Sequence, residues 1–114
     1  MGRRAHCQIR QLEYGDCKLT DWAQSSALEY LQECGINVMS NEDCNLEDAD
    51  QWEIEIDSAK IRKAIKNLRK DPSLVQTEES ESPRDCGDDL ADVLEEGLQA
   101  AKKRKYTSIY LDWF

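Results

Sequence analysis

The chain is poor in the residues from which most small catalytic and nucleotide-binding sites are built. It has a single histidine, His6, and five isolated glycines, at Gly2, Gly15, Gly35, Gly87 and Gly97. A phosphate-binding loop needs several glycines close together at the start of a helix, and a nucleophilic cysteine needs a base beside it. We therefore predict that the protein has no nucleotide site of this type, is not an enzyme and carries no cofactor.

Closely spaced cysteines are also missing. The chain has five cysteines, an odd number, at Cys7, Cys17, Cys34, Cys44 and Cys86. Such wide spacing is typical of reduced thiols in a cytosolic protein. A zinc site usually takes its four ligands as close pairs, and the only local pair here, His6 and Cys7, would point to opposite faces of a strand. The sequence predicts no metal site.

Long hydrophobic runs are absent. No segment approaches the ~18 to 20 apolar residues that cross a bilayer, and the basic start MGRRAHCQIR lacks the apolar core of a signal peptide. We therefore expect a cytoplasmic protein. The length of 114 residues suits a single domain, spanning residues 1–114, with an ordinary hydrophobic core.

What the chain has in excess is acid, and the acid is unevenly distributed. The net charge is -9, yet residues 42–57 alone carry -8, and residues 78–96 carry another -8. The remainder of the chain therefore carries +7. A charge division of this kind gives information about partners rather than about fold.

The N-terminal half alternates between strand and helix patterns. Residues 4–13 have strand alternation, and residues 17–19 are expected to return beside them as a hairpin. A helix then follows, with Asp21 or Thr20 as its cap and Gln24 completing a capping box. Gly35 stands where a left-handed residue ends a helix. A short strand is expected at 36–39 and a loop at 40–50.

The middle and C-terminal parts give clearer patterns. Residues 51–57 alternate as a strand with one wet face. A helix capped by Asp57 or Ser58 follows, with Ile61, Ile65 and Leu68 as its apolar stripe, and ends before Pro72. Residues 71–87 are expected to form a mobile acidic linker. A third helix should start near Asp88, with one apolar side formed by Leu90, Val93, Leu94, Leu98 and Ala101. Residues 106–114 should form a strand in the middle of the sheet. The predicted class is α+β, with about three helices packed on a mostly antiparallel sheet of four or so strands.

The strand at residues 51–57 carries the most specific functional pattern. Its wet face presents Glu53, Glu55 and Asp57 at alternate positions, about 6.6 to 7 Å apart given ~3.3 to 3.4 Å per residue. That spacing is close to the ~7 Å between successive phosphates of a nucleic-acid strand, consistent with one charge per ~3.4 Å of axis rise. The row could therefore occupy a basic groove made for nucleic acid. The preceding loop adds Glu47, Asp48 and Asp50. The alternative is that these acids only keep the protein soluble.

The C-terminal strand offers a second partner-binding candidate. Tyr106, Tyr110 and Phe114 fall on one face of it. If a helix covers that face, these aromatics belong to the core. If the face is open, aromatics beside acids have the composition of a protein-binding hot spot.

These features together indicate a binding protein. The small size, segregated acid, reduced thiols and missing catalytic groups resemble, at class level, the acidic inhibitor proteins of phages and mobile elements, including anti-CRISPR and DNA-mimic proteins. We expect an acidic surface that docks on a basic, nucleic-acid-handling protein, while the net charge argues against direct nucleic-acid binding. The alternatives are an immunity protein against a nuclease toxin, a subunit of a larger assembly, or a small enzyme with Cys17 or Cys86 as nucleophile.

Overall fold

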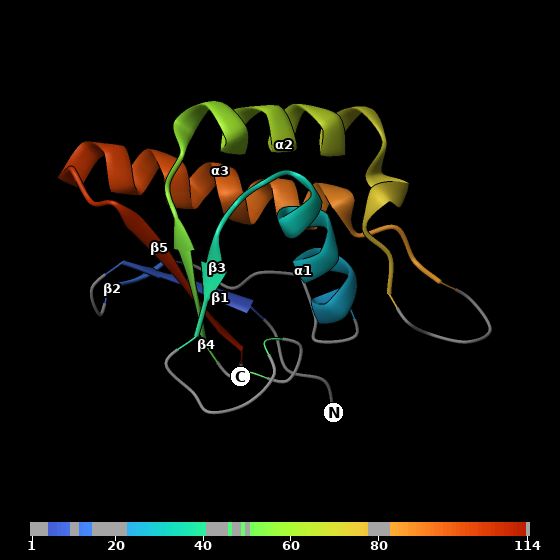
Figure 1. Cartoon of the computed structure of the whole chain (residues 1–114), viewed down its shortest axis with the longest axis horizontal. Helices are drawn as coiled ribbons and strands as arrows, with labels where there is room; N and C mark the ends of the chain where they lie inside the picture. Colours follow the sequence, from blue (N-terminus) through green and yellow to red (C-terminus); the bar gives the residue numbers. More distant parts are fainter. Residues whose placement is uncertain are drawn as a thin grey trace.

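Figure 1 shows a computed structural model in which three helices pack on one antiparallel sheet. The structure describes residues 5–9, 12–14, 23–40, 46, 49, 51–77 and 83–113. The strands are β1 (Ala5–Ile9), β2 (Leu12–Tyr14), β3 (Val38–Met39), β4 (Gln51–Glu55) and β5 (Ser108–Trp113), and the helices are α1 (Gln24–Glu33), α2 (Ser58–Lys70), the short 3-10 helix η3 (Pro72–Leu74) and α3 (Gly87–Arg104). The predicted α+β class is confirmed.

The sheet is antiparallel throughout the described chain, in the order β2-β1-β5-β4-β3. The predicted count of four strands is not confirmed, because this order contains five. The C-terminal strand β5 lies in the middle of the sheet as predicted, between β1 and β4. In the N-terminal hairpin Ile9 pairs with Leu12, so the return strand begins at Leu12 and not at residue 17. Leu12, which breaks the alternation of the first strand, marks the start of the next one.

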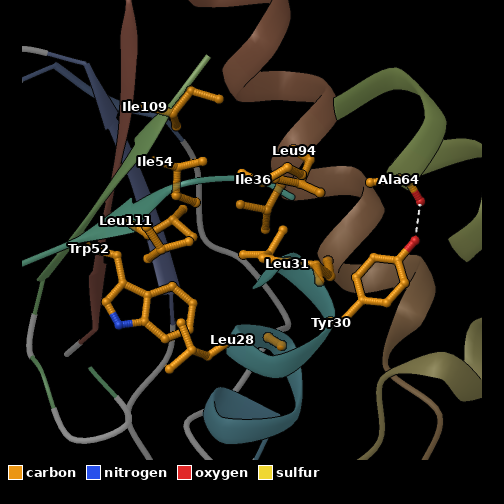
Figure 2. Packing of buried hydrophobic residues seen from close by; sticks show 14 of the residues in the cluster. Leu28, Tyr30, Leu31, Ile36, Trp52, Ile54, Ala64, Leu94, Ile109 and Leu111 are labelled. Carbon is orange, nitrogen blue, oxygen red and sulfur yellow. Dashed lines mark hydrogen bonds between the residues drawn. The ribbon is translucent and has the colours of Figure 1, made fainter. Parts of the chain in front are cut away.

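The core lies between the sheet and the helices. Trp52 and Ile54 of β4 pair in register with Leu111 and Ile109 of β5, and all four side chains have no exposed surface. Figure 2 shows these side chains pointing from the strands toward α1 and α3. Their burial supplies the hydrophobic free energy that holds the helices on the sheet, about 1.5–3 kcal/mol for each large side chain.

Helix α1 ends as predicted. Gly35 has φ +76, its N–H bonds to the Gln32 carbonyl, and the Ile36 N–H bonds to the Leu31 carbonyl, which is a Schellman motif. The predicted caps Thr20 and Asp21, and with them the capping box to Gln24, lie outside the described residues. Gln24 has a further tertiary role. Its side chain is buried, and its amide donates to the Ala49 carbonyl at 2.8 Å, because a buried amide must find a partner and the chain near residue 49 lies beside it.

Helix α2 is capped by Asp57, whose carboxylate accepts a hydrogen bond from the Lys60 N–H at 3.2 Å. Its buried stripe is Ile61, Ala64 and Leu68, while Ile65, predicted for the same stripe, is only half-buried. Tyr30 ties α1 to α2, because its hydroxyl donates to the Ala64 carbonyl at 2.8 Å (Figure 2).

The predicted linker at residues 71–87 contains fixed structure at both ends. Pro72–Leu74 forms η3, and residues 76 and 85 form an isolated antiparallel bridge. The Cys86 N–H bonds to the Val75 carbonyl at 2.7 Å, and both of these side chains are fully buried. Residues 71–77 and 83–87 therefore belong to the folded body, and residues 78–82 lie outside the described residues. A single buried apolar residue such as Val75 produces no periodic pattern, so the packing of this segment could not be predicted from the sequence.

Helix α3 has the buried stripe that the sequence predicts, formed by Leu90, Val93, Leu94, Leu98 and Ala101. It starts at Gly87 and ends at Arg104, and the C-cap residue Lys105 has a left-handed φ of 59. None of the described helices has the length and apolar character needed to cross a membrane.

Candidate partner-binding surface

The helices leave one face of the central sheet uncovered by any helix of the described chain. In β4 the buried Trp52 and Ile54 alternate with Glu53 and Glu55, so the two acids lie on the face opposite the core. In β5 the same alternation places Ser108 and Tyr110 on that face, since Ile109 is buried. We call this surface the open sheet face and define it as Met39, Glu53, Glu55, Tyr106, Ser108 and Tyr110.

Strand register brings the side chains of the open sheet face into rows. Met39 of β3 is paired with Glu53, and Glu53 is paired with Tyr110. The row therefore crosses three strands and sets an acid between an apolar and an aromatic residue. Met39 is 40 % exposed, one of the larger apolar exposures among the described residues. Aromatic residues and methionine are enriched in protein interfaces.

Two hydrogen bonds hold the acids in place. Glu53 accepts from the Ser108 hydroxyl at 3.3 Å, and Glu55 accepts from the Asn37 side-chain amide at 3.1 Å. Each bond uses one carboxylate oxygen, so the other can accept from a partner. A small hollow of about 170 Å³ lies beside Glu53 and is lined by Tyr106, Thr107, Ser108 and Tyr110. The face thus offers fixed acceptors next to aromatic rings that are half-buried.

Asp57 does not continue the row of Glu53 and Glu55. It follows the end of β4, and its carboxylate is used as the N-cap of α2 and as a partner of the Lys60 ammonium at 3.9 Å. A short acid directly before a helix has a local use that strand alternation does not reveal, because it accepts from an N–H that would otherwise lack a partner. The regular row of the described chain therefore has two acids.

The remaining predicted partner-binding residues divide into two groups. Tyr106 precedes β5, packs against the core and is half-buried, so it belongs partly to the core and partly to the open sheet face. Glu47, Asp48, Asp50 and Phe114 lie outside the described residues. Met39 and Ser108 were missed by the sequence reasoning. The strand predicted at residues 36–39 could have indicated that Met39 lies in the sheet. Its pairing with Glu53 could not be predicted, because the register between the two strands is set by the fold.

Three described acids of the second acidic segment, Asp88, Asp92 and Glu95, form ion pairs within the molecule. Arg69 of α2 bonds to Asp92 at 2.6 Å, to Glu95 at 3.2 Å and to Asp88 at 3.5 Å, all on α3. The hydrogen bond to Asp92, with those to Glu95 and Asp88, raises the pKa of Arg69 above its ordinary value. The three acids repeat along one face of α3 at intervals of four and three residues, a signal that could have indicated a shared cation. These carboxylates stabilise helix packing.

Cys86 does not resemble a reactive cysteine. Cys86 is fully buried, and this burial raises the pKa of its thiol. A thiol that stays protonated and is inaccessible is a poor nucleophile. Cys17, the other predicted nucleophile of the enzyme alternative, lies outside the described residues. Within the part of the chain that the structure describes, no three His, Cys, Asp or Glu side chains are grouped as metal ligands.

Comparisons of the chain with protein-family models, with curated proteins and with solved structures find no match.

Proposed function

We propose that the protein is a small acidic binding module that docks its open sheet face on a basic, nucleic-acid-handling protein, as an inhibitor of the anti-CRISPR or DNA-mimic type would. One observation carries the proposal. Glu53 and Glu55 stand at alternate positions of a strand, on a face that no described helix covers, with Met39 and Tyr110 in register beside them.

The acids supply the charge recognition. Their spacing along β4 is ~6.6 to 7 Å, which suits a groove whose arginines and lysines are placed to bind successive phosphates. Their hydrogen bonds to Ser108 and Asn37 restrict their rotamers before binding. Less side-chain entropy is then lost on association.

The apolar residues supply the anchor. Tyr110 is half-buried and Met39 is partly exposed, so a partner can bury both without separating the sheet from the helices. Interface energy is usually concentrated in a few such residues, surrounded by polar contacts that exclude water. The acids then determine encounter rate and specificity more than affinity.

The experiment uses affinity capture from nuclease-treated extract of the native cell. Three baits are compared: the wild type, the double variant E53K/E55K, and the control E29K/E96K, which makes the same charge change at exposed helix acids. Asp57 is left unchanged, because it caps α2. We expect wild type and control to capture the same basic protein, and E53K/E55K to lose at least about tenfold in affinity, about 1.4 kcal/mol.

Two further arms make the test specific. Duplex DNA should compete with the wild-type bait for the captured protein, since both would occupy one groove. Association should weaken as salt rises, because exposed charges are screened. Equal capture by E53K/E55K and wild type would contradict the proposal, as would capture that disappears when nucleic acid is digested.

A further inference from the structure

A second site lies on the other side of the molecule, between α2 and α3. The two helices run antiparallel beside one another (Figure 1). A groove of about 330 Å³ lies between them, lined by Arg62, Ile65, Arg69, Glu95, Leu98, Gln99 and Lys102. The lining residues of α2 recur at intervals of three and four, and those of α3 lie within two turns with Glu95 and Gln99, and Leu98 and Lys102, four apart, so each helix contributes one face. The volume is within the usual range for small-molecule sites, about 300 to 1,000 Å³.

The groove has an apolar floor. Ile65 is half-buried and Leu98 is 5 % exposed. The spacing of Ile65 matches the core stripe of α2, but part of its side chain stays exposed and lines the groove. The aliphatic stems of arginine and lysine extend such a floor while their charged ends stay in water.

The charges at the two ends of the groove differ. At one end the single positive charge of Arg69 faces three carboxylates, those of Asp88, Asp92 and Glu95, so this end has a net negative charge. At the other end stand Arg62 and Lys102, neither of which forms an ion pair with a carboxylate of the described chain. The groove therefore combines an apolar floor, a negative end and a positive end.

From this arrangement we infer that the groove binds a small organic anion whose carboxylate or phosphate meets Arg62 and Lys102 and whose apolar body lies on Ile65 and Leu98. Arginine and lysine together suit such a head group, because the guanidinium donates in a fixed fork and the ammonium adds a point charge. A protein helix is a poorer occupant, since two apolar side chains offer far less than the ~800 Å² per partner of a stable interface. The site is separate from the open sheet face and does not depend on its function.

The test uses probes that share one body and differ in the head group. Octanoate, octanol and octylammonium are titrated into the full-length protein, and the methyl NMR signals of Ile65 and Leu98 are followed. We expect saturable shifts with octanoate, and affinities at least tenfold lower for octanol and octylammonium. Acetate, which has the head group alone, should shift neither methyl group. An octyl phosphate arm shows whether the site favours a phosphate or a carboxylate head.

Two variant pairs locate the binding. R62Q/K102Q should lower octanoate affinity at least tenfold, whereas K63Q/K103Q, which removes two exposed cations outside the lining, should stay within twofold of wild type. I65S should weaken octanoate and leave the melting temperature close to that of the wild type, since Ile65 is only half-buried. Octanol binding as tightly as octanoate, or unchanged binding by R62Q/K102Q, would overturn the inference. So would methyl shifts that change on dilution without ligand, because a second copy would then occupy the groove.

Discussion

The packing of Gly87 against Pro72 gives a sharp prediction about stability. A Cβ added at Gly87 would lie 2.5 Å from the Pro72 Cα, 2.6 Å from its carbonyl oxygen and 2.9 Å from its carbonyl carbon, whereas ordinary contact begins at 3.4 Å. The Pro72 backbone would therefore have to move by about 0.9 Å. It is not free to do so, because the neighbouring Val75 carbonyl accepts from Cys86 and both side chains are buried.

The expected cost of Gly87→Ala follows from two opposing effects. Overpacking typically costs ~1–3 kcal/mol, and contact with rigid backbone places this case near the upper end. The higher helix propensity of alanine stabilises the folded protein by at most ~1 kcal/mol relative to glycine. We expect a net loss of about 2 kcal/mol, which lowers the melting temperature by about 8 °C in a domain of this size. Urea unfolding followed by far-UV circular dichroism measures the free energy, and thermal unfolding measures the midpoint.

Gly35 provides the matched control. It has φ +76, but a Cβ there would meet only the Lys60 side chain, at 3.6 Å or more. Gly35→Ala should cost ~1–2 kcal/mol through the left-handed backbone alone, and Gly35→Asn less, since asparagine tolerates this conformation. At Gly87 alanine and asparagine should be equally harmful, because both have the clashing Cβ. A Gly87→Ala protein as stable as the wild type would refute the reasoning.

Three further predictions concern the core and the helix interface. Tyr30→Phe should lower the free energy of unfolding by about 1 kcal/mol at pH 7, because the hydrogen bond to Ala64 is lost. Burial, with a contribution from Cys34, raises the pKa of Tyr30, so the stability advantage of the wild type is complete below pH ~10 and declines above it. Equal stability differences at pH 7 and pH 10.5 would contradict this. Arg69→Met should cost about 1 kcal/mol at low salt and less at high salt, because its partners are largely exposed; a loss independent of salt in urea unfolding would count against the ion pairs. Trp52→Phe should cost about 2–3 kcal/mol through a smaller buried ring and the lost bond to the Leu46 carbonyl at 2.7 Å, and a calorimetric loss below about 0.5 kcal/mol would be inconsistent with its burial.

The candidate surface could be predicted in part. Alternation alone placed Glu53 and Glu55 on the wet face of a strand, because successive side chains of a strand point to opposite faces. It could not show that Asp57 leaves the row, since capping is decided by the helix that follows. Nor could it show that Tyr110 and Met39 flank Glu53, because cross-strand neighbours depend on the register of segments far apart in the chain.

The sequence by itself determined the features that depend on local physics. The apolar stripe of α3 and the left-handed Gly35 each require only residues within a few positions, and the same local pattern limited the cap of α2 to Asp57 or Ser58. The tertiary structure decided what depends on distant partners: the burial of Gln24 against Ala49, the packing of Val75 and Cys86, and the use of Arg69 to hold three acids of α3. It also decided which acids remain available to a partner. A buried polar group or a charge takes whatever complement the fold brings near it, and one-dimensional patterns do not contain that information.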